Sequence, residues 1–206
     1  IYAEGIAFGD EDDSAALNRL EGEEGNDSLF GGRGLDLLFG DNGADFLYGG
    51  HGHDTLEGGT GNDTLIGSDG DDMLAGGGGT DSIDGGSGND RIVWADNLDS
   101  LDGGDGFDWL IVSAGLFVDL GLMENQILGG SWVAGFEAVD GRSATASMTL
   151  LGSADGSYLI SGVENDTLFG GAGDDILQSG AGSDTLNGGT GVNILEGGTG
   201  NDLYIG

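Results

Sequence analysis

Aspartate recurs at every ninth residue over most of this 206-residue chain, at a fixed place in a glycine-rich unit. Between Gly49 and Gly67 two such units follow each other, and each reads Gly-Gly-x-Gly-x-Asp-x-Leu-x. Carboxylates at regular spacing could do one of two kinds of chemistry, acid–base catalysis or the binding of cations. The residues at position 6 of the units are Asp27, Asp36, Asp45, Asp54, Asp63, Asp72, Asp81, Asp90, Asp99, Asp108, Asp166, Asp175, Asp184, Asn193 and Asp202.

Cation binding accounts for this series better than catalysis does. A glycosidase needs one pair of carboxyl groups, whereas every aspartate of the series has the same place in a repeating unit. The other donors nearby are backbone carbonyls of a glycine-rich turn, and an all-oxygen set with flexible geometry suits Ca2+. Mg2+ demands a tighter octahedron, and Zn2+ prefers nitrogen or sulfur ligands. We therefore expect the position-6 residues to be calcium ligands, and we expect no catalytic residue and no enzyme activity.

A period of nine residues predicts a solenoid, in which each unit is stabilised by its neighbours. Position 8 is Leu or Ile in every unit of the first run and Leu or Tyr in the second. We interpret x-Leu-x as a short strand whose central side chain points inward. The preceding six residues form a turn, in which glycine at positions 1, 2 and 4 adopts conformations that other residues resist. Stacked in parallel, these strands bury a ladder of leucine.

Two nonapeptide units make one coil, so that every second unit stacks on the same side. Stacked strands lie about 4.8 Å apart, and carboxylates at that spacing repel by roughly 1 kcal/mol per adjacent pair even in water. A cation between two such carboxylates turns this repulsion into a net attraction. An interior aspartate such as Asp63 has two oxygens and can face the ion above and the ion below. The same-side gaps admit at most about eleven Ca2+ ions, which would bring the net charge of −34 to about −12.

The unit is similar to the nonapeptide of the RTX (repeats-in-toxin), haemolysin-type calcium-binding family. Fifteen units match, within Gly22–Ile111 and Ser161–Ile205, and they depart from the pattern at Trp94, Ala95 and Asn97 of one unit and at Asn193. The resemblance implies an all-β, right-handed parallel β-roll (a β-helix or solenoid) with Ca2+ between stacked turns. The ligands it implies are the position-6 residues of both turns and backbone carbonyls of positions 1 to 4. It also implies a bacterial protein exported by type I secretion, which folds on Ca2+ outside the cell or at the cell surface.

We expect four segments along the chain. Residues 1–21 form an N-terminal cap with a degenerate repeat, in which Asn18 and Leu20 occupy positions 6 and 8. Residues 22–111 and 161–206 are the first and second RTX arrays. The spacing from Asp108 to Asp166 is not a multiple of nine, so residues 112–160 are expected to be an irregular, calcium-poor solenoid bridge. The alternative for the bridge is a contact surface for another protein chain or a cell-surface glycan.

The composition excludes several classes of partner and compartment. The chain has 38 acidic residues, four Arg and no Lys, so it cannot neutralise a nucleic-acid backbone. It has no Cys and therefore no disulfide framework, and it has no apolar run long enough to predict a membrane span. The start has neither the basic head nor the apolar core of a signal peptide. It begins with Ile1 rather than Met, from which we expect a processed or truncated chain.

His51 and His53 lie at positions 3 and 5 of one unit, where other units carry varied residues. We expect them to face solvent and to be dispensable for folding, with a transition-metal or pH-sensitive contact as the alternative. Two functions from different classes remain open for the chain. It is a structural and adhesive surface component, or it is an accessory calcium-binding module of a type I-secreted enzyme such as a protease, lipase or alginate epimerase. The second would need a catalytic domain elsewhere, because the chain has no His-Glu-x-x-His or Gly-x-Ser-x-Gly motif.

Overall fold

The computed structural model describes residues 6–9, 17–94, 99–113, 117–120, 126–128 and 131–206. Strands, turns and bends make up this part of the chain, and the strand ladders between neighbouring coils are parallel. Ala95 and Asn97 of the degenerate unit lie outside the described residues. None of the described residues belongs to a helix of the length and apolar character needed to cross a membrane. The fold divides into two compact units, which are described separately: unit 1 is 1–108 with 129–135, and unit 2 is 109–128 with 136–206.

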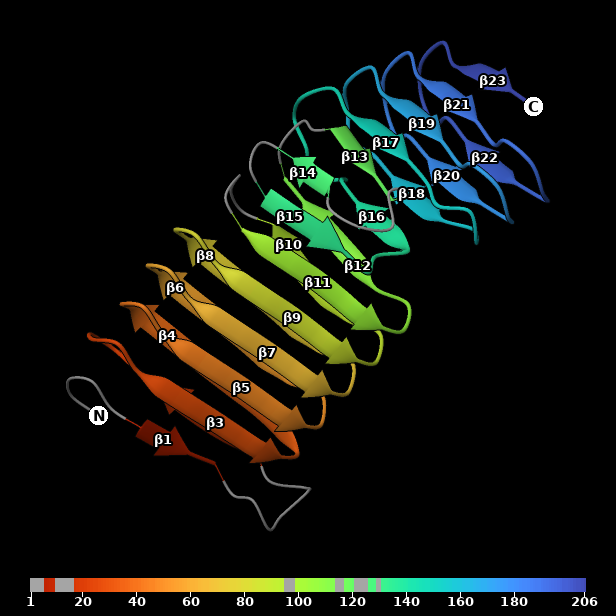
Figure 1. The fold of residues 1–206 in the computed structure, drawn as a ribbon. Helices are drawn as coiled ribbons and strands as arrows, with labels where there is room; N and C mark the ends of the chain where they lie inside the picture. Colours follow the sequence, from red (N-terminus) through yellow and green to blue (C-terminus); the bar gives the residue numbers. More distant parts are fainter. Residues whose placement is uncertain (1–5, 10–16, 95–98, 114–116, 121–125, 129–130) are drawn as a thin grey trace. The chain divides into compact units, whose positions relative to one another are not determined.

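In unit 1, consecutive strands alternate between two parallel sheets, and each strand from β3 to β9 pairs with the second strand before and after it (Figure 1), whereas β11 pairs with β9 and β15. One sheet contains β1 (Ile6–Phe8), β3 (Ser28–Arg33), β5 (Phe46–His51), β7 (Thr64–Asp69), β9 (Ser82–Ser87), β11 (Ser100–Asp105) and β15 (Ser131–Ala134). The other contains β2 (Leu17–Glu21), β4 (Leu35–Asn42), β6 (Thr55–Thr60), β8 (Met73–Gly78) and β10 (Arg91–Trp94).

The register of these sheets is the predicted one of two nonapeptides per coil. Leu47 lies opposite Leu29 on one side and Leu65 on the other. Asn18 and Leu20 of the cap lie opposite Asp36 and Leu38, which confirms their places at positions 6 and 8. Because side chains alternate along a strand, this register puts the position-8 residue of every coil on the inner face.

Most strands of unit 1, such as β3, β5 and β7, are longer than the short x-Leu-x strands expected from the sequence. The ladder continues through positions 1 to 3 of the next nonapeptide, so that Gly32 pairs with Gly50 and Arg33 with His51. A parallel stack aligns the turn residues of successive coils as closely as the strand residues. Part of the predicted turn therefore joins the sheet.

The core is the inner ladder of position-8 side chains. They are 0–2 % exposed from Leu29 through Leu101 in unit 1 and from Leu150 through Leu186 in unit 2. A fully buried Leu contributes about 1.5–3 kcal/mol relative to an exposed one. The ladder weakens at the last two nonapeptides, where Leu195 is partly exposed and Tyr204 is 53 % exposed.

Close stacking also explains the glycine at position 4. Gly79 has φ +142°, and a Cβ built there would overlap the carbonyl oxygen of Gly61 in the coil below. At the preceding position 3, a Cβ on Gly78 would meet no atom within 4 Å. Glycine is thus required at position 4 by both backbone conformation and space, whereas at Gly78 it is not.

Unit 2 is also built from parallel strands (Figure 1). One set of paired strands contains β12 (Trp109–Val112), β16 (Ala138–Asp140), β18 (Tyr158–Ile160), β20 (Ile176–Gln178) and β22 (Ile194–Glu196). The other contains β13 (Phe117–Asp119), β17 (Thr149–Leu151), β19 (Thr167–Phe169), β21 (Thr185–Asn187) and β23 (Leu203–Ile205). The strand β14 (Gln126–Leu128) also belongs to this unit.

The regular register of unit 2 begins before Ser161. Leu150 pairs with Leu168, and Leu159 pairs with Leu177, in each case two nonapeptides further along the chain. Met148 and Ser157 consequently occupy position 6, although neither carries a carboxylate. Earlier in the unit the register is irregular, since Leu110 pairs with Val139 at a spacing that is not a multiple of nine.

Candidate calcium-binding loops

The position-6 aspartates from Asp27 to Asp184 lie where the turns meet the inner-facing strands, and they are buried. Asp36, Asp90 and Asp108 are 0 % exposed, and the others from Asp27 to Asp184 are at most 3 % exposed. Asn193 and Asp202, in the last two nonapeptides, are partly exposed. A buried carboxylate is costly unless it is hydrogen-bonded and its charge is balanced.

One oxygen of each carboxylate joins two coils. Oδ1 of Asp63 accepts a hydrogen bond of 2.8 Å from the backbone N–H of Asp45 in the coil below, and Asp81 Oδ1 does the same for Asp63. The bond recurs along both sides of unit 1, at 2.7–3.0 Å, with acceptors Asp45, Asp54, Asp63, Asp72, Asp81, Asp90, Asp99 and Asp108. In unit 2 the acceptors are Asp166, Asp175, Asp184, Asn193 and Asp202.

The second oxygen has no such partner. Oδ2 of these side chains is buried and accepts no hydrogen bond at Asp36, Asp45, Asp54, Asp63, Asp72, Asp90, Asp166, Asp175 and Asp184. It faces the glycine at position 1 of its own nonapeptide, so that a Cβ on Gly58 would lie 2.5 Å from Asp63 Oδ2. Buried acceptors are almost always satisfied. A row of buried carboxylate oxygens without hydrogen-bond donors therefore fits a cation as their partner.

We expected the two oxygens of an interior aspartate to face the ion above and the ion below; in the structure Oδ1 accepts a hydrogen bond and Oδ2 accepts none. Oδ1 is already engaged because the position-6 N–H of the coil below would otherwise be buried without an acceptor. Oδ2 is the oxygen left for a metal.

Burial makes these carboxyl groups hard to ionise without a cation. Burial, together with the nearby charges of Asp54, Asp90 and Asp71, raises the pKa of Asp72 to about 7. Burial likewise raises the pKa of Asp54, Asp63 and Asp90 to about 6. Hydrogen bonds from the backbone act in the opposite direction but are outweighed. A proton or a metal ion must compensate the charge in the folded state.

The donors fit Ca2+. They are carboxylate and backbone oxygens, which are the ligands that hard cations take, and Ca2+ accepts six to eight of them in irregular geometry. Within the described residues no group of three or more His, Cys, Asp or Glu side chains converges on one point. The carboxylate and backbone oxygens of the loops are also not the nitrogen and sulfur donors that Zn2+ prefers.

Asparagine at position 6 changes the chemistry of the loop. Asn193 Oδ1 accepts the N–H of Asp175 at 2.9 Å, so its Nδ2 occupies the place that Oδ2 has elsewhere. Near the start of unit 1, Asn18 Nδ2 donates to Asp36 Oδ1 at 2.7 Å. An amide N–H cannot ligate a cation. Asn193 retains the bond between coils but loses the metal-facing oxygen.

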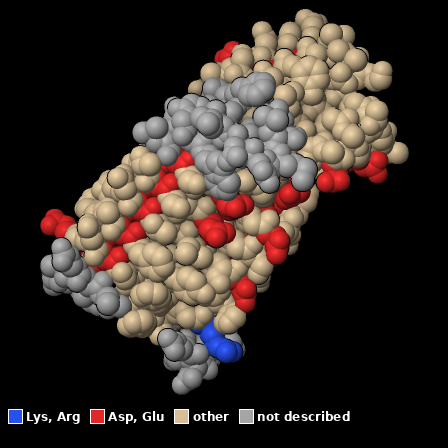
Figure 2. Space-filling model, viewed as in Figure 1, with Lys and Arg blue, Asp and Glu red and all other residues tan. Residues whose placement is uncertain are grey.

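Acidic residues gather in rows on the face of unit 1 that Figure 2 shows, and arginine is scarce there. The rows follow from the constant register, because equivalent positions of successive coils lie directly above one another. The charge of the chain is thus ordered by the fold rather than dispersed.

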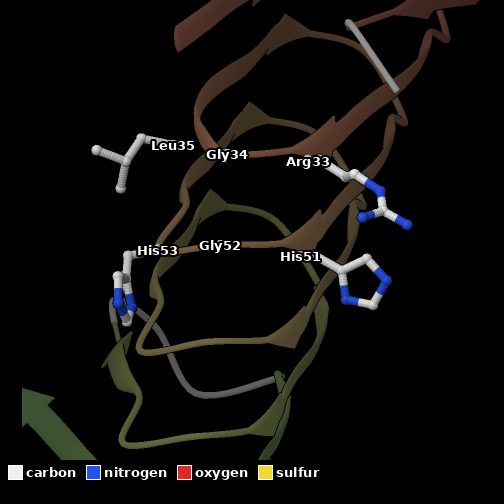
Figure 3. Close-up of a pocket in the computed structure, with 6 residues that line it drawn as sticks. All are labelled: Arg33, Gly34, Leu35, His51, Gly52 and His53. Carbon is white, nitrogen blue, oxygen red and sulfur yellow. The ribbon is translucent and has the colours of Figure 1, made fainter. Parts of the chain in front are cut away.

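His51 and His53 do not form a metal site together. They lie in a pocket with Arg33, Gly34, Leu35 and Gly52, and they leave the loop on opposite sides (Figure 3). Both are exposed, as expected. His51 Nδ1 lies 2.6 Å from Asp69 Oδ2, and His53 Nδ1 accepts the backbone N–H of Asp71 at 2.7 Å.

Two features of the loops were missed from the sequence. The first is the in-register pair Met148 and Ser157, for which the spacing of Leu150, Leu159 and Leu168 was a usable signal. The second is the bonding of position-5 side chains between coils, as at His53. Its signal was the frequent Asn or Asp before the position-6 residue.

Comparison with known proteins agrees with this geometry. The family model of the RTX calcium-binding nonapeptide repeat matches more than half of the chain. A search of curated proteins found no match to the chain. The second group of matches begins at residue 151, in the region where the structure first shows the regular register of unit 2. The matched residues are 21–56, 34–65, 57–92, 151–186, 160–195 and 178–206.

Proposed function

We propose that this chain, which belongs to the RTX calcium-binding nonapeptide-repeat family, folds by binding multiple Ca2+ ions, about eleven at most, through its position-6 residues. One observation carries the proposal: the buried Oδ2 atoms of the position-6 aspartates have no hydrogen-bond partner, at nine positions from Asp36 to Asp184. The all-oxygen donor set and the net charge of −34 support the same cation.

The chain's own residues prepare each gap between same-side loops. Oδ1 of the aspartate in the upper loop accepts a hydrogen bond from the backbone N–H of the aspartate in the lower loop, as Asp72 does from Asp54. Oδ2 is turned away from water over the position-1 glycine. Bound Ca2+ supplies the positive charge and the coordination that this oxygen lacks. Without it, neighbouring carboxylates repel at a spacing of about 4.8 Å.

We further propose a structural and adhesive role at the bacterial surface after type I secretion. A fold that needs many Ca2+ ions is unfavourable where calcium is scarce and forms where it reaches the millimolar range of extracellular modules. Residues 112–160, which include the coils that precede the regular register of unit 2, are the proposed contact with a protein chain or surface glycan. The alternative is an accessory module of a secreted enzyme. Mass spectrometry of the intact native protein separates the two, because a large additional domain would favour the enzyme.

A calcium titration followed by far-UV circular dichroism tests the proposed function. We expect a disordered spectrum in EGTA and a β-rich spectrum at roughly 0.1–1 mM Ca2+, with little change in the same concentration of Mg2+. A strongly β-rich spectrum in EGTA would refute calcium-driven folding.

A further inference from the structure

Position-5 side chains form a second set of bonds between coils. Asn62 Oδ1 accepts the backbone N–H of Thr80, which is the position-5 residue of the next coil on that side, at 3.0 Å. The same bond occurs seven times at 2.7–3.0 Å, always from the position-5 N–H to the side chain of the coil below. Its acceptors are Asn26, His53, Asn62, Asp71, Asn89, Asn165 and Asp174.

This bond spans the same gap as the proposed calcium site. Between the loops of Asp63 and Asp81, the lower loop gives the N–H of Asp63 to Asp81 Oδ1. The upper loop returns the N–H of Thr80 to Asn62. The two bonds run in opposite directions from adjacent residues, so they fix both the distance and the tilt of the two loops around the metal-facing oxygen.

Among the gaps of unit 1 whose position-5 residues the structure describes, two have only the first of these bonds. Position 5 of the lower loop is Ala44 below the Asp45–Asp63 gap and Leu35 below the Asp36–Asp54 gap, and neither side chain has an acceptor atom. The first bond is present in both gaps, at 2.8 Å. The loops are therefore held unequally along the stack although their aspartates are equivalent.

We propose that the position-5 side chain determines the calcium affinity of the gap above it, so that gaps with this acceptor fill at lower Ca2+ than those above Leu35 and Ala44. This inference rests on the proposed function. An acceptor at position 5 holds the loops near their bound distance before the ion arrives, and preorganisation of this kind raises affinity by lowering the cost of ordering. These side chains are positioning residues, not ligands.

His53 has the same positioning role. Its Nδ1 accepts the backbone N–H of Asp71, just as Asn62 Oδ1 accepts that of Thr80. On this side of the roll the successive acceptors are His53, Asp71 and Asn89. It acts by hydrogen bonding and needs no transition metal.

The test uses one loss and one gain of the acceptor in the full chain. Asn62→Ala removes the acceptor above which Thr80 lies, and Leu35→Asn adds one below the His53 N–H. Leu35→Ala is the matched control, because it truncates a position-5 side chain without removing an acceptor. Amide hydrogen exchange at saturating Ca2+ and residue-resolved NMR titration with Ca2+ are measured on all three variants and the unchanged chain.

We expect the Thr80 amide to exchange roughly 2- to 10-fold faster in Asn62→Ala, the range for one net hydrogen bond. The His53 amide should slow by a similar factor in Leu35→Asn and stay unchanged in Leu35→Ala. The Ca2+ midpoint at the Asp63–Asp81 gap should rise in Asn62→Ala, and that at the Asp36–Asp54 gap should fall in Leu35→Asn. Exchange rates that change without any change in these local midpoints would overturn the proposal. A chain without a calcium transition in any form would instead overturn the proposed function itself.

Discussion

Adjacent glycines at positions 3 and 4 allow a sharp test of the stacked turn. Gly79→Ala places a methyl group where φ is +142° and where the carbonyl of Gly61 already lies, with the carbonyl carbon 2.6 Å from the new Cβ. A backbone conformation of this kind costs of order 1–3 kcal/mol for a residue other than glycine. Because the overlapping atoms belong to the backbone, the coils must also separate to relieve the overlap. We therefore expect Gly79→Ala to destabilise the roll by about 3 kcal/mol or more.

Gly78→Ala is the control, one residue away. Its Cβ meets nothing within 4 Å, and its φ lies outside the left-handed region. A tolerated Gly→Ala change stabilises by about 0.4–1 kcal/mol through the unfolded state. Urea unfolding in saturating Ca2+ measures both variants. Equal stabilities for the two would refute the conclusion that position-4 carbonyls and α-carbons are in contact between coils.

Three further predictions concern the position-6 residues. Asp63→Ala should raise the Ca2+ midpoint further than Asp202→Ala, because Asp63 borders two gaps, toward Asp45 and toward Asp81, whereas Asp202 borders the single gap to Asp184; equal shifts at equal ionic strength would contradict this. Burial raises the pKa of Asp72 to about 7 in the metal-free fold, so this group favours folding below its ordinary pKa of 3.8 and loses that effect as pH rises through 7. The calcium-depleted chain should accordingly show more β structure by circular dichroism at pH 4 than at pH 8, and the reverse order would show the sign to be wrong. Asn193→Asp restores a metal-facing oxygen and should add one tightly bound ion in native mass spectrometry; an unchanged count would place that oxygen outside the site.

The sequence was sufficient to predict the parallel β-roll, the coil of two nonapeptides and the inward ladder at position 8. Each follows from one period: Leu47 cannot lie between Leu29 and Leu65 unless every coil has the same length. The membership of Asn18 and Leu20 in a degenerate coil was predictable for the same reason.

Other features depend on contacts that a period does not encode. Oδ1 and Oδ2 differ in their contacts because the position-6 N–H of one coil donates a hydrogen bond to Oδ1 of the position-6 aspartate in the next coil. Met148 and Ser157 keep their place without the aspartate that marks the nonapeptide, because the leucine ladder sets the register. His53 was interpreted as dispensable from the variety of residues at position 5, whereas acceptor capacity, rather than residue type, is what seven of these positions share.

The central claim is that Ca2+ lies between same-side loops, beside the buried Oδ2 atoms. Anomalous X-ray diffraction from crystals grown in Ca2+ measures this directly. We predict a peak in each gap that is bordered by two position-6 aspartates, including the gap between Asp54 and Asp72, with Oδ2 among the ligands. Gaps without peaks in a fully folded chain, or peaks bound only at exposed side chains, would contradict the account.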